Sequence, residues 1–321
     1  MKKNIYSLAL ICILCGLSSC GLYRKRMTVK TFEPLNVKSA PLEYTPIKWT
    51  SDSIGNKWNK HAALFIPASI NGTDRKFYFQ LDLGIPTTRL YGNTLKSFID
   101  KYPNLASHQK AAGEHSFFQD ATITLNKHTS LIASKLPVIS FGKENIDSSF
   151  TIMGSFGYDF LGENILILDF KQNRYALTDA LSEEMKQKTS FIKKPDLDKF
   201  PVILPMKLGK KNIRVMYDSG SSMFPILTGN NRLQRLTKKK HIDSLCCISS
   251  WGNNYPIYHT KNKKEITINN HSHRKEEIYG FEKLNKLAFT GKYLYGITGN
   301  KLFLNKIIII DRKNNQFGII Y

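Results

Sequence analysis

The chain contains two copies of one pattern of strands and turns, and this internal repeat constrains the fold more than any other feature. The copies begin at about residues 65 and 203. In each copy an apolar strand leads into an Asp-x-Gly turn, and a second strand and a helix start follow. The two turns begin at Asp82 and Asp218.

A second pair of segments closes each copy. Residues 157–175 and 299–317 both contain a glycine, an apolar strand and an Asp at the end of that strand. The strands end at Asp169 and Asp311, and the interval between these two is close to the interval between Asp82 and Asp218. Two copies of nearly equal length, with their parts in the same order, predict a duplicated domain.

The rest of the folded region is typical of β-structure. Short runs rich in Phe, Tyr, Ile and Val alternate with Gly, Asn and Asp from about residue 61 onward. Helical patterns are few and short, and they occur at 93–102, 181–188 and 230–239. We therefore predict an all-β fold.

The second copy carries the most specific pattern. An apolar strand before Asp-Ser-Gly at 217–222, followed later by Tyr-Gly-Ile-Thr-Gly at 295–299, resembles the aspartic peptidases of the pepsin and retropepsin type. The tail at 297–318 resembles the closing segment of their second lobe. The resemblance implies two pseudo-twofold-related, aspartic-peptidase-like β-barrel lobes, at 61–190 and 191–321, with a cleft between them.

The resemblance also implies a catalytic pair. Asp82 and Asp218 would face each other and share one proton, so that one activates a water molecule as a base while the other acts as an acid. Gly84 and Gly220 would let the backbone approach the carboxylates, since glycine has no Cβ. From the residues alone, each Asp is also consistent with a turn aspartate that caps its own backbone.

The supporting hydroxyl groups differ between the two copies. In the family, the residue between Asp and Gly binds the opposite loop through a hydroxyl, which Ser219 can supply and Leu83 cannot. The position after the glycine is Ser221 in one copy and Ile85 in the other. Two functions therefore stay open. One is an aspartic endopeptidase, and the other is a catalytically impaired module that binds peptides or envelope polymers on the same fold.

The hairpin that covers substrate in pepsin-like enzymes also differs. The corresponding region, 113–120, lacks the usual Tyr-Gly pair. Phe117 or Phe118 could cover the cleft instead, although core packing is the favoured interpretation for both rings.

The N-terminus is typical of an export signal. Lys2 and Lys3 precede an apolar stretch that ends in Leu-Ser-Ser-Cys at residues 17–20. Small residues directly before a cysteine resemble a bacterial lipobox, which implies a signal peptide at 1–19 and a lipid such as palmitate on Cys20. We predict a lipidated tether at 20–60 and a location in the bacterial cell envelope, at the outer membrane.

The charge balance favours anionic partners. The chain has 47 Lys plus Arg against 25 Asp plus Glu, a formal net charge of +22. Membranes, anionic envelope polymers and nucleic acid all fit such a charge. Basic segments without an aromatic stacking pattern, together with the export signal, argue against nucleic acid. We predict a monomer that acts on a peptide or protein and contacts the membrane through Cys20.

No cofactor or metal is predicted. The C-terminal histidines are interspersed with lysines and arginines, which oppose a divalent cation and indicate a solvated basic face. They are His241, His259, His271 and His273. Cys246 and Cys247 are predicted to be two half-buried thiols.

Overall fold

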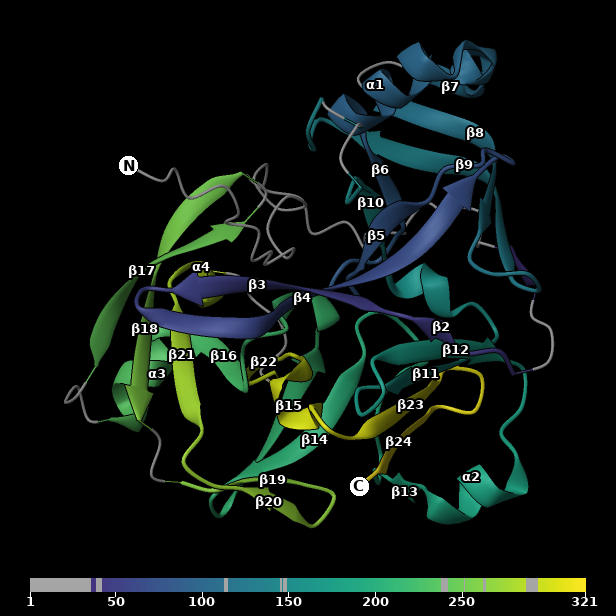
Figure 1. The fold of residues 1–321 in the computed structure, drawn as a ribbon. Coiled ribbons are helices and arrows are strands. Elements are labelled where there is room, and N and C mark those ends of the chain that lie inside the picture. The colour runs from purple at the N-terminus through teal and green to yellow at the C-terminus, as the bar shows by residue number, and fades with distance from the viewer. Residues whose placement is uncertain are drawn as a thin grey trace.

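The computed structural model describes residues 36–38, 42–112, 115–144, 146, 149–237, 242–250, 252–261, 264–286 and 294–321. These residues form three sheets and a few short helices, which confirms the all-β prediction (Figure 1). The predicted signal peptide at 1–19 and the lipidation site Cys20 lie outside the described residues.

The N-terminal sheet has nine strands in the described part of the chain. Their order is β1-β9-β6-β10-β5-β4-β8-β7, β3 also pairs with β4, and β8 also pairs with β9. The strands are β1 (Asn36–Lys38), β3 (Lys48–Ile54), β4 (Lys57–Ile70), β5 (Phe77–Leu81), β6 (Arg89–Tyr91), β7 (Gln109–Ala112), β8 (His115–Thr124), β9 (Ser130–Ile139) and β10 (Ile152–Phe156).

The C-terminal sheet also has nine strands among the described residues. Their order is β17-β18-β21-β16-β22-β15-β14-β19-β20. The strands are β14 (Ile203–Leu208), β15 (Lys211–Tyr217), β16 (Ile226–Gly229), β17 (Asp243–Ser250), β18 (Asn253–Lys261), β19 (Ile266–Ile268), β20 (His271–His273), β21 (Glu277–Phe281) and β22 (Gly296–Thr298).

The two large sheets repeat one arrangement of strands. The path β9-β6-β10-β5-β4 in the first corresponds to β21-β16-β22-β15-β14 in the second. In both, the strand before the Asp-x-Gly turn pairs in parallel with the strand that carries the later apolar-apolar-Gly, as β5 with β10 and β15 with β22. The repeat found in the sequence therefore has a counterpart in the order of the strands.

A third sheet joins the two halves of the chain. Its order is β13-β24-β23-β11-β12-β2, from β2 (Thr45–Pro46), β11 (Ile165–Asp169), β12 (Arg174–Thr178), β13 (Ser190–Phe191), β23 (Ile307–Asp311) and β24 (Gln316–Ile320). At its centre, Ile167 on β11 faces Ile309 on β23. On either side, residue 165 faces 311 and residue 169 faces 307, so the register is symmetric about that central pair.

The helices are short, as the sequence predicts. The α-helices are α1 (Gly92–Lys101), α2 (Glu183–Lys188), α3 (Asn230–Leu236) and α4 (Lys283–Lys286). The 3-10 turns are η1 (Pro103–His108), η2 (Tyr158–Leu161), η3 (Ser219–Ser221) and η4 (Asn300–Phe303). Helix α1 buries Leu95 and Phe98 against the N-terminal sheet. Ser182 caps α2, because its hydroxyl accepts a hydrogen bond from the amide of Met185 (3.2 Å).

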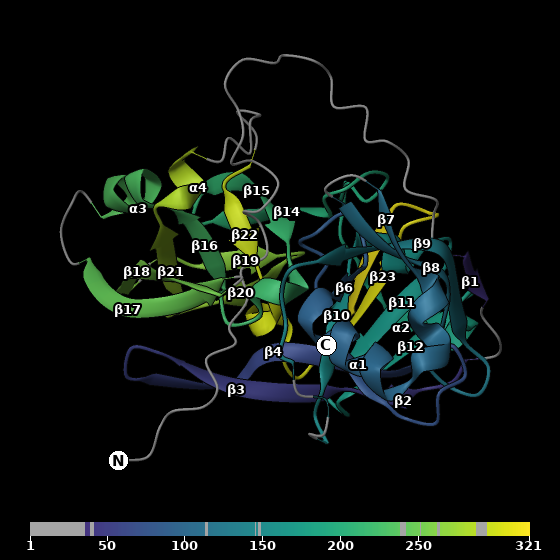
Figure 2. The same ribbon diagram turned by 90° about the horizontal axis from the view of Figure 1, so that it is seen from above.

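The predicted tether is wrong over its described part. Most of residues 42–60 belong to strands, because β3 and the start of β4 form a long hairpin that turns at Gly55 with φ of +60°. Figures 1 and 2 show this hairpin extending from the N-terminal half toward β17 and β18. Its buried side chains Ile54 and Ala62 belong to a hydrophobic cluster whose other buried members all come from the C-terminal sheet, its loops and helix α4. The partner surface that orders the hairpin thus lies far away in sequence.

Candidate active site

The two predicted aspartates occupy equivalent positions at the ends of central strands. Asp82 follows β5 and its amide donates to the carbonyl of Phe156 (2.9 Å). Asp218 follows β15 and its amide donates to the carbonyl of Thr298 (3.0 Å). Because each strand is hydrogen-bonded on both sides, each carboxylate is held on a rigid support.

Stacked aromatic rings lie behind the two turns. Phe79 and Phe156 stack with their ring centroids 4.4 Å apart, and Phe156 stacks on Phe160 at 4.6 Å. Behind the second turn, the rings of Tyr217 and Phe303 meet edge to face at 5.7 Å. This packing fixes the strands from which both aspartates extend.

The two turns lie against each other. A Cβ on Gly84 would come closer than 3.0 Å to the carboxylate of Asp218, and a Cβ on Gly220 would come equally close to the carboxylate of Asp82. Any side chain at either position would therefore collide with the opposite aspartate. The structure thus brings together the two pairs of residues that the sequence predicts for the site.

Asp218 accepts several hydrogen bonds from its own turn. The amides of Gly220 (2.8 Å) and Ser221 (3.3 Å) donate to Oδ1, and the hydroxyl of Ser221 donates to Oδ2 (2.7 Å). Burial raises the pKa of Asp218, while hydrogen bonds with Ser221, with the Asp82 side chain and with the Gly220 amide oppose this rise.

Ser219 connects the two turns. Its hydroxyl donates to the carbonyl of Leu81 (2.8 Å) and accepts from the amide of Leu83 (2.9 Å). Leu83 occupies the equivalent position in the first turn, and its buried apolar side chain cannot return such a contact. Of the two equivalent residues, only Ser219 therefore links the turns through a hydroxyl group, as the sequence predicts.

The first turn offers its aspartate fewer hydroxyl groups. The amide of Gly84 donates to Oδ1 of Asp82 (3.1 Å). Ile85, which is 2% exposed, stands where the second turn has Ser221, so this position contributes apolar contact instead of a hydroxyl. Both aspartates are 0% exposed, so the described arrangement shields the carboxylates from bulk solvent.

Two further residues position the turns, and the sequence analysis did not identify them. Asp159 Oδ1 accepts from the amide and the hydroxyl of Thr88 (both 2.7 Å), and burial raises the pKa of Asp159 to about 6. In the second copy, Asn300 donates to the carbonyl of Ser219 (3.3 Å) and accepts from the hydroxyl of Tyr217 (2.6 Å). The repeat aligns Asn300 with Tyr158 and Lys301 with Asp159, because η2 and η4 begin at Tyr158 and Asn300, so it gave no signal for this pair of residues.

The region predicted to lie over the cleft forms the hairpin of β7 and β8. Phe118 is 0% exposed within the main core and stacks on His108 at 5.3 Å, so its interpretation as a core residue is confirmed. Phe117 is half-buried, with Nζ of Lys135 at 3.9 Å from its ring centroid. Residues 113 and 114 at the hairpin turn lie outside the described residues.

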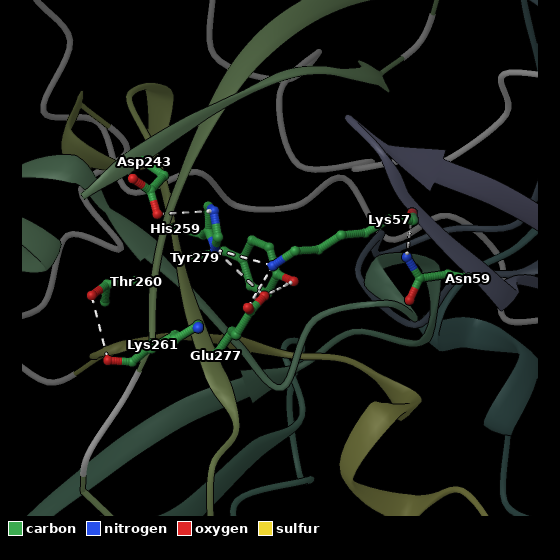
Figure 3. Close-up of polar contacts among 8 residues, drawn as sticks. All are labelled: Lys57, Asn59, Asp243, His259, Thr260, Lys261, Glu277 and Tyr279. Atoms are coloured by element: carbon green, nitrogen blue, oxygen red, sulfur yellow. Dashed lines mark hydrogen bonds and ion pairs between the residues drawn. The ribbon is translucent and has the colours of Figure 1, made fainter. Parts of the chain in front are cut away.

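His259 does not lie on a solvated face, which corrects the prediction. It is 6% exposed and stacks on the ring of Tyr279. Figure 3 shows it among charged groups from three strands: Lys57 of β4 lies 2.5 Å from Glu277 of β21, and Asp243 of β17 lies 3.7 Å from His259. The local lysines that suggested solvent exposure could not reveal this cluster, because its carboxylates and Lys57 come from distant parts of the chain.

The other histidines differ from one another in their surroundings. His271 is exposed and stacks on Tyr321, whereas burial and the charge of Lys306 lower the pKa of His273 to about 4. His241 lies outside the described residues. Among the residues that the structure describes, no group of three or more metal-binding side chains is arranged to hold an ion.

The prediction of two thiols at 246 and 247 is wrong. Cys246 and Cys247 form a disulfide, with an S–S distance of 1.98 Å. They lie on β17 where the register with β18 shifts between Leu245 and Ile248. At such an irregularity adjacent side chains are released from the strict alternation between the two faces of a strand, which allows the two sulfurs to meet.

Comparison with known proteins gives no family for this chain. No family model matches it, and no curated protein matches it. In the described parts of the chain, we find no helix of the length and apolar character needed to cross a bilayer.

Proposed function

We propose that this protein hydrolyses peptide bonds with an Asp82 and Asp218 dyad, on a two-lobed fold of the aspartic-peptidase type. The observation that carries the proposal is the reciprocal packing of Gly84 and Gly220 on the opposite carboxylates, which brings Asp82 and Asp218 to one place between the two turns. The repeated order of strands and the symmetric register of β11 and β23 support the two-lobed arrangement.

The proposed reaction requires one aspartate of the dyad to be ionised and the other to be protonated. The ionised carboxylate takes a proton from a water molecule while the water oxygen attacks the peptide carbonyl. The protonated acid then gives its proton to the peptide nitrogen as the C–N bond breaks, which releases an amine and a carboxylic acid. Hydrolysis should be lost when both acids ionise at high pH and when both are protonated at low pH.

A second candidate function has its own support. Leu83 and Ile85 replace two supporting hydroxyl groups, and both carboxylates are 0% exposed. Turnover would require a change that admits water and an extended peptide to the dyad, and a misplacement of about 1 Å can reduce the rate about a hundredfold. The alternative is therefore a catalytically impaired module that binds a peptide by strand addition or holds an envelope polymer.

The test compares the chain lacking residues 1–20 with its Asp82→Asn and Asp218→Asn variants. Each is incubated with a mixed peptide library from about pH 3 to 7, and products are identified by mass spectrometry. The control is Asp198→Asn, which removes an exposed carboxylate from a loop outside the dyad. We expect cleavage by the unmodified chain and the control, and none by either dyad variant.

Other outcomes would decide against the enzyme. Cleavage that survives Asp218→Asn would exclude the dyad as its source. Absence of cleavage at every pH, in protein with an intact β-type circular dichroism spectrum, would favour the binding module. Capture of library peptides by the unmodified chain would then be the next measurement.

The proposed location is the bacterial cell envelope, with the protein attached to the outer membrane through lipid on Cys20 and acting on a peptide or protein substrate. This part of the proposal depends on the sequence before the described residues. Metabolic labelling with an alkyne-bearing palmitate should label the unmodified chain and a Cys246→Ala, Cys247→Ala variant. The Cys20→Ala variant should carry no label, and equal labelling of all three would refute the anchor.

A further inference from the structure

A cationic cavity lies on the C-terminal half, and neither Asp82 nor Asp218 is among the residues that line it. Its volume is about 630 Å³, and its lining residues come from β14, β15, the turn between β19 and β20 and the segment after β13. Figure 1 shows these elements near one another in the lower part of the molecule. Five cationic side chains line it: Lys193, Lys207, Lys211, Arg214 and Arg232. The described lining contains no carboxylate.

The strand register explains why cationic side chains lie next to each other on one face of β14 and β15. Residues alternate between the two faces of a strand, and the neighbours of Pro205 and Lys207 on β14 are buried in the core. Pro205 and Lys207 therefore face outward. Lys207 pairs with Asn212 of β15 and with Thr267 of β19, and Pro205 pairs with Arg214. The outer face thus presents two cations and two neutral polar groups side by side.

Two of the other lining cations, Lys211 and Arg232, contact the Tyr295 segment. Arg232 donates to the carbonyls of Leu294 (2.9 Å) and Tyr295, and its guanidinium lies 5.0 Å from the centroid of the Tyr295 ring. Lys211 Nζ lies 5.4 Å from the same ring. These contacts orient the cations without neutralising them, since carbonyls and an aromatic ring carry no net charge.

Acidic side chains near the cavity neutralise little of its positive charge. Arg214 forms an ion pair of 3.5 Å with Asp196, and the two side chains are 41% and 47% exposed. Exposed pairs of this kind contribute little because solvent screens them. The cavity therefore keeps a surplus of positive charge that an anionic ligand would offset.

We propose that this cavity binds a small phosphorylated saccharide of one or two sugar rings. Lysine and arginine side chains match phosphate oxygens, with arginine able to donate two parallel hydrogen bonds. The amides of Asn212, Asn269 and Asn270 match the hydroxyl groups of a sugar ring. A nucleotide fits less well, because Tyr295, the one aromatic ring among the described lining residues, is 7% exposed and offers no open face for a base.

The volume agrees with this class of ligand. Cavities of roughly 300 to 1,000 Å³ are typical of small-molecule sites. The site does not depend on the dyad, so it can be tested in protein with or without hydrolytic activity. A phosphorylated sugar could reach it as a free molecule or as the headgroup of an envelope glycolipid, and both sources present the same chemistry.

The test uses the chain lacking residues 1–20, which retains every described residue. Glucose 1,6-bisphosphate is titrated into it by calorimetry, and binding to phosphatidylcholine vesicles is measured with and without diphosphorylated lipid A. A Lys207→Gln, Arg214→Gln double variant should bind the preferred probe at least tenfold more weakly. A Lys207→Gln, Lys211→Gln variant, which keeps the pair of Arg214 with Asp196, should be weakened in the same way.

The control variant is Lys76→Gln, Lys127→Gln, which removes two exposed charges from the N-terminal half and should bind as the unmodified chain does. Binding of the free sugar would identify a soluble ligand, and binding only to vesicles with lipid A would identify a headgroup. Equal loss in the cavity and control variants would overturn the site, as would no binding of either probe. Equally tight binding of ADP at the same residues would overturn the saccharide assignment.

Discussion

Replacing Ser219 with alanine should destabilise the protein much more than the loss of one oxygen atom suggests. The hydroxyl of Ser219 bridges the carbonyl of Leu81 (2.8 Å) and the amide of Leu83 (2.9 Å), and all three residues are 0% exposed. Alanine would leave a buried donor and a buried acceptor without this partner. At about 1 to 3 kcal/mol for each of the two unsatisfied groups, we expect a loss of roughly 2 to 6 kcal/mol in the free energy of unfolding.

Urea denaturation followed by circular dichroism and by fluorescence would measure this loss, with two probes because the halves need not unfold together. Ser130→Ala is the matched control, since that hydroxyl is half-buried and its hydrogen bond to Thr124 is long at 3.4 Å. The control should change stability by less than about 0.5 kcal/mol. A Ser219→Ala effect in that same small range would refute the view that this hydroxyl braces the two turns.

Three other perturbations follow from the structure. Ile54→Ala should cost about 2 to 5 kcal/mol of unfolding free energy, because Ile54 is 1% exposed among side chains of the C-terminal half, whereas Trp58→Ala on the same hairpin, 65% exposed, should cost far less. Asp159 has its pKa raised to about 6, so the folded chain keeps this proton longer than the unfolded chain and loses stability as pH rises from about 4 to 6. Asp159→Asn should remove up to roughly 3 kcal/mol of this change in unfolding free energy, measured by denaturation at several pH values. The same dependence of unfolding free energy on pH in the variant would contradict the raised pKa of Asp159. Gly84→Ala should abolish any hydrolysis and lower the melting temperature, because its Cβ would collide with the carboxylate of Asp218, and a fully active variant would disprove the packing.

Local patterns carried most of what the sequence could reveal. Helix α1 spans residues 92–101 where the pattern predicts 93–102, because its apolar spacing and the following Pro103 are local signals. Asp82 and Asp218 were found because they recur at matched positions, and the recurrence is visible without knowledge of the fold. The loss of the hydroxyl at Leu83 was equally visible, since it follows from comparing the two copies.

The features that could not be predicted from the sequence depend on long-range contacts. The start of β4 reads as a polar segment, and it is a strand because the tip of its hairpin packs on the other half of the chain. His259 stands among lysines in the sequence, yet its partners Glu277 and Asp243 reach it only through sheet pairing. No rule of composition or spacing anticipates such neighbours, because they depend on which strands become adjacent.

The symmetric register of β11 and β23 has a consequence for how the amino-acid sequences of the two halves could diverge. Around Ile167 and Ile309 the strands meet as two identical subunits meet across a twofold axis, each offering the same edge to the other. A symmetric homodimer could not alter one turn without altering both. Covalent linkage of the halves removes that restriction, so a serine can persist at 219 while its counterpart at position 83 becomes a buried leucine.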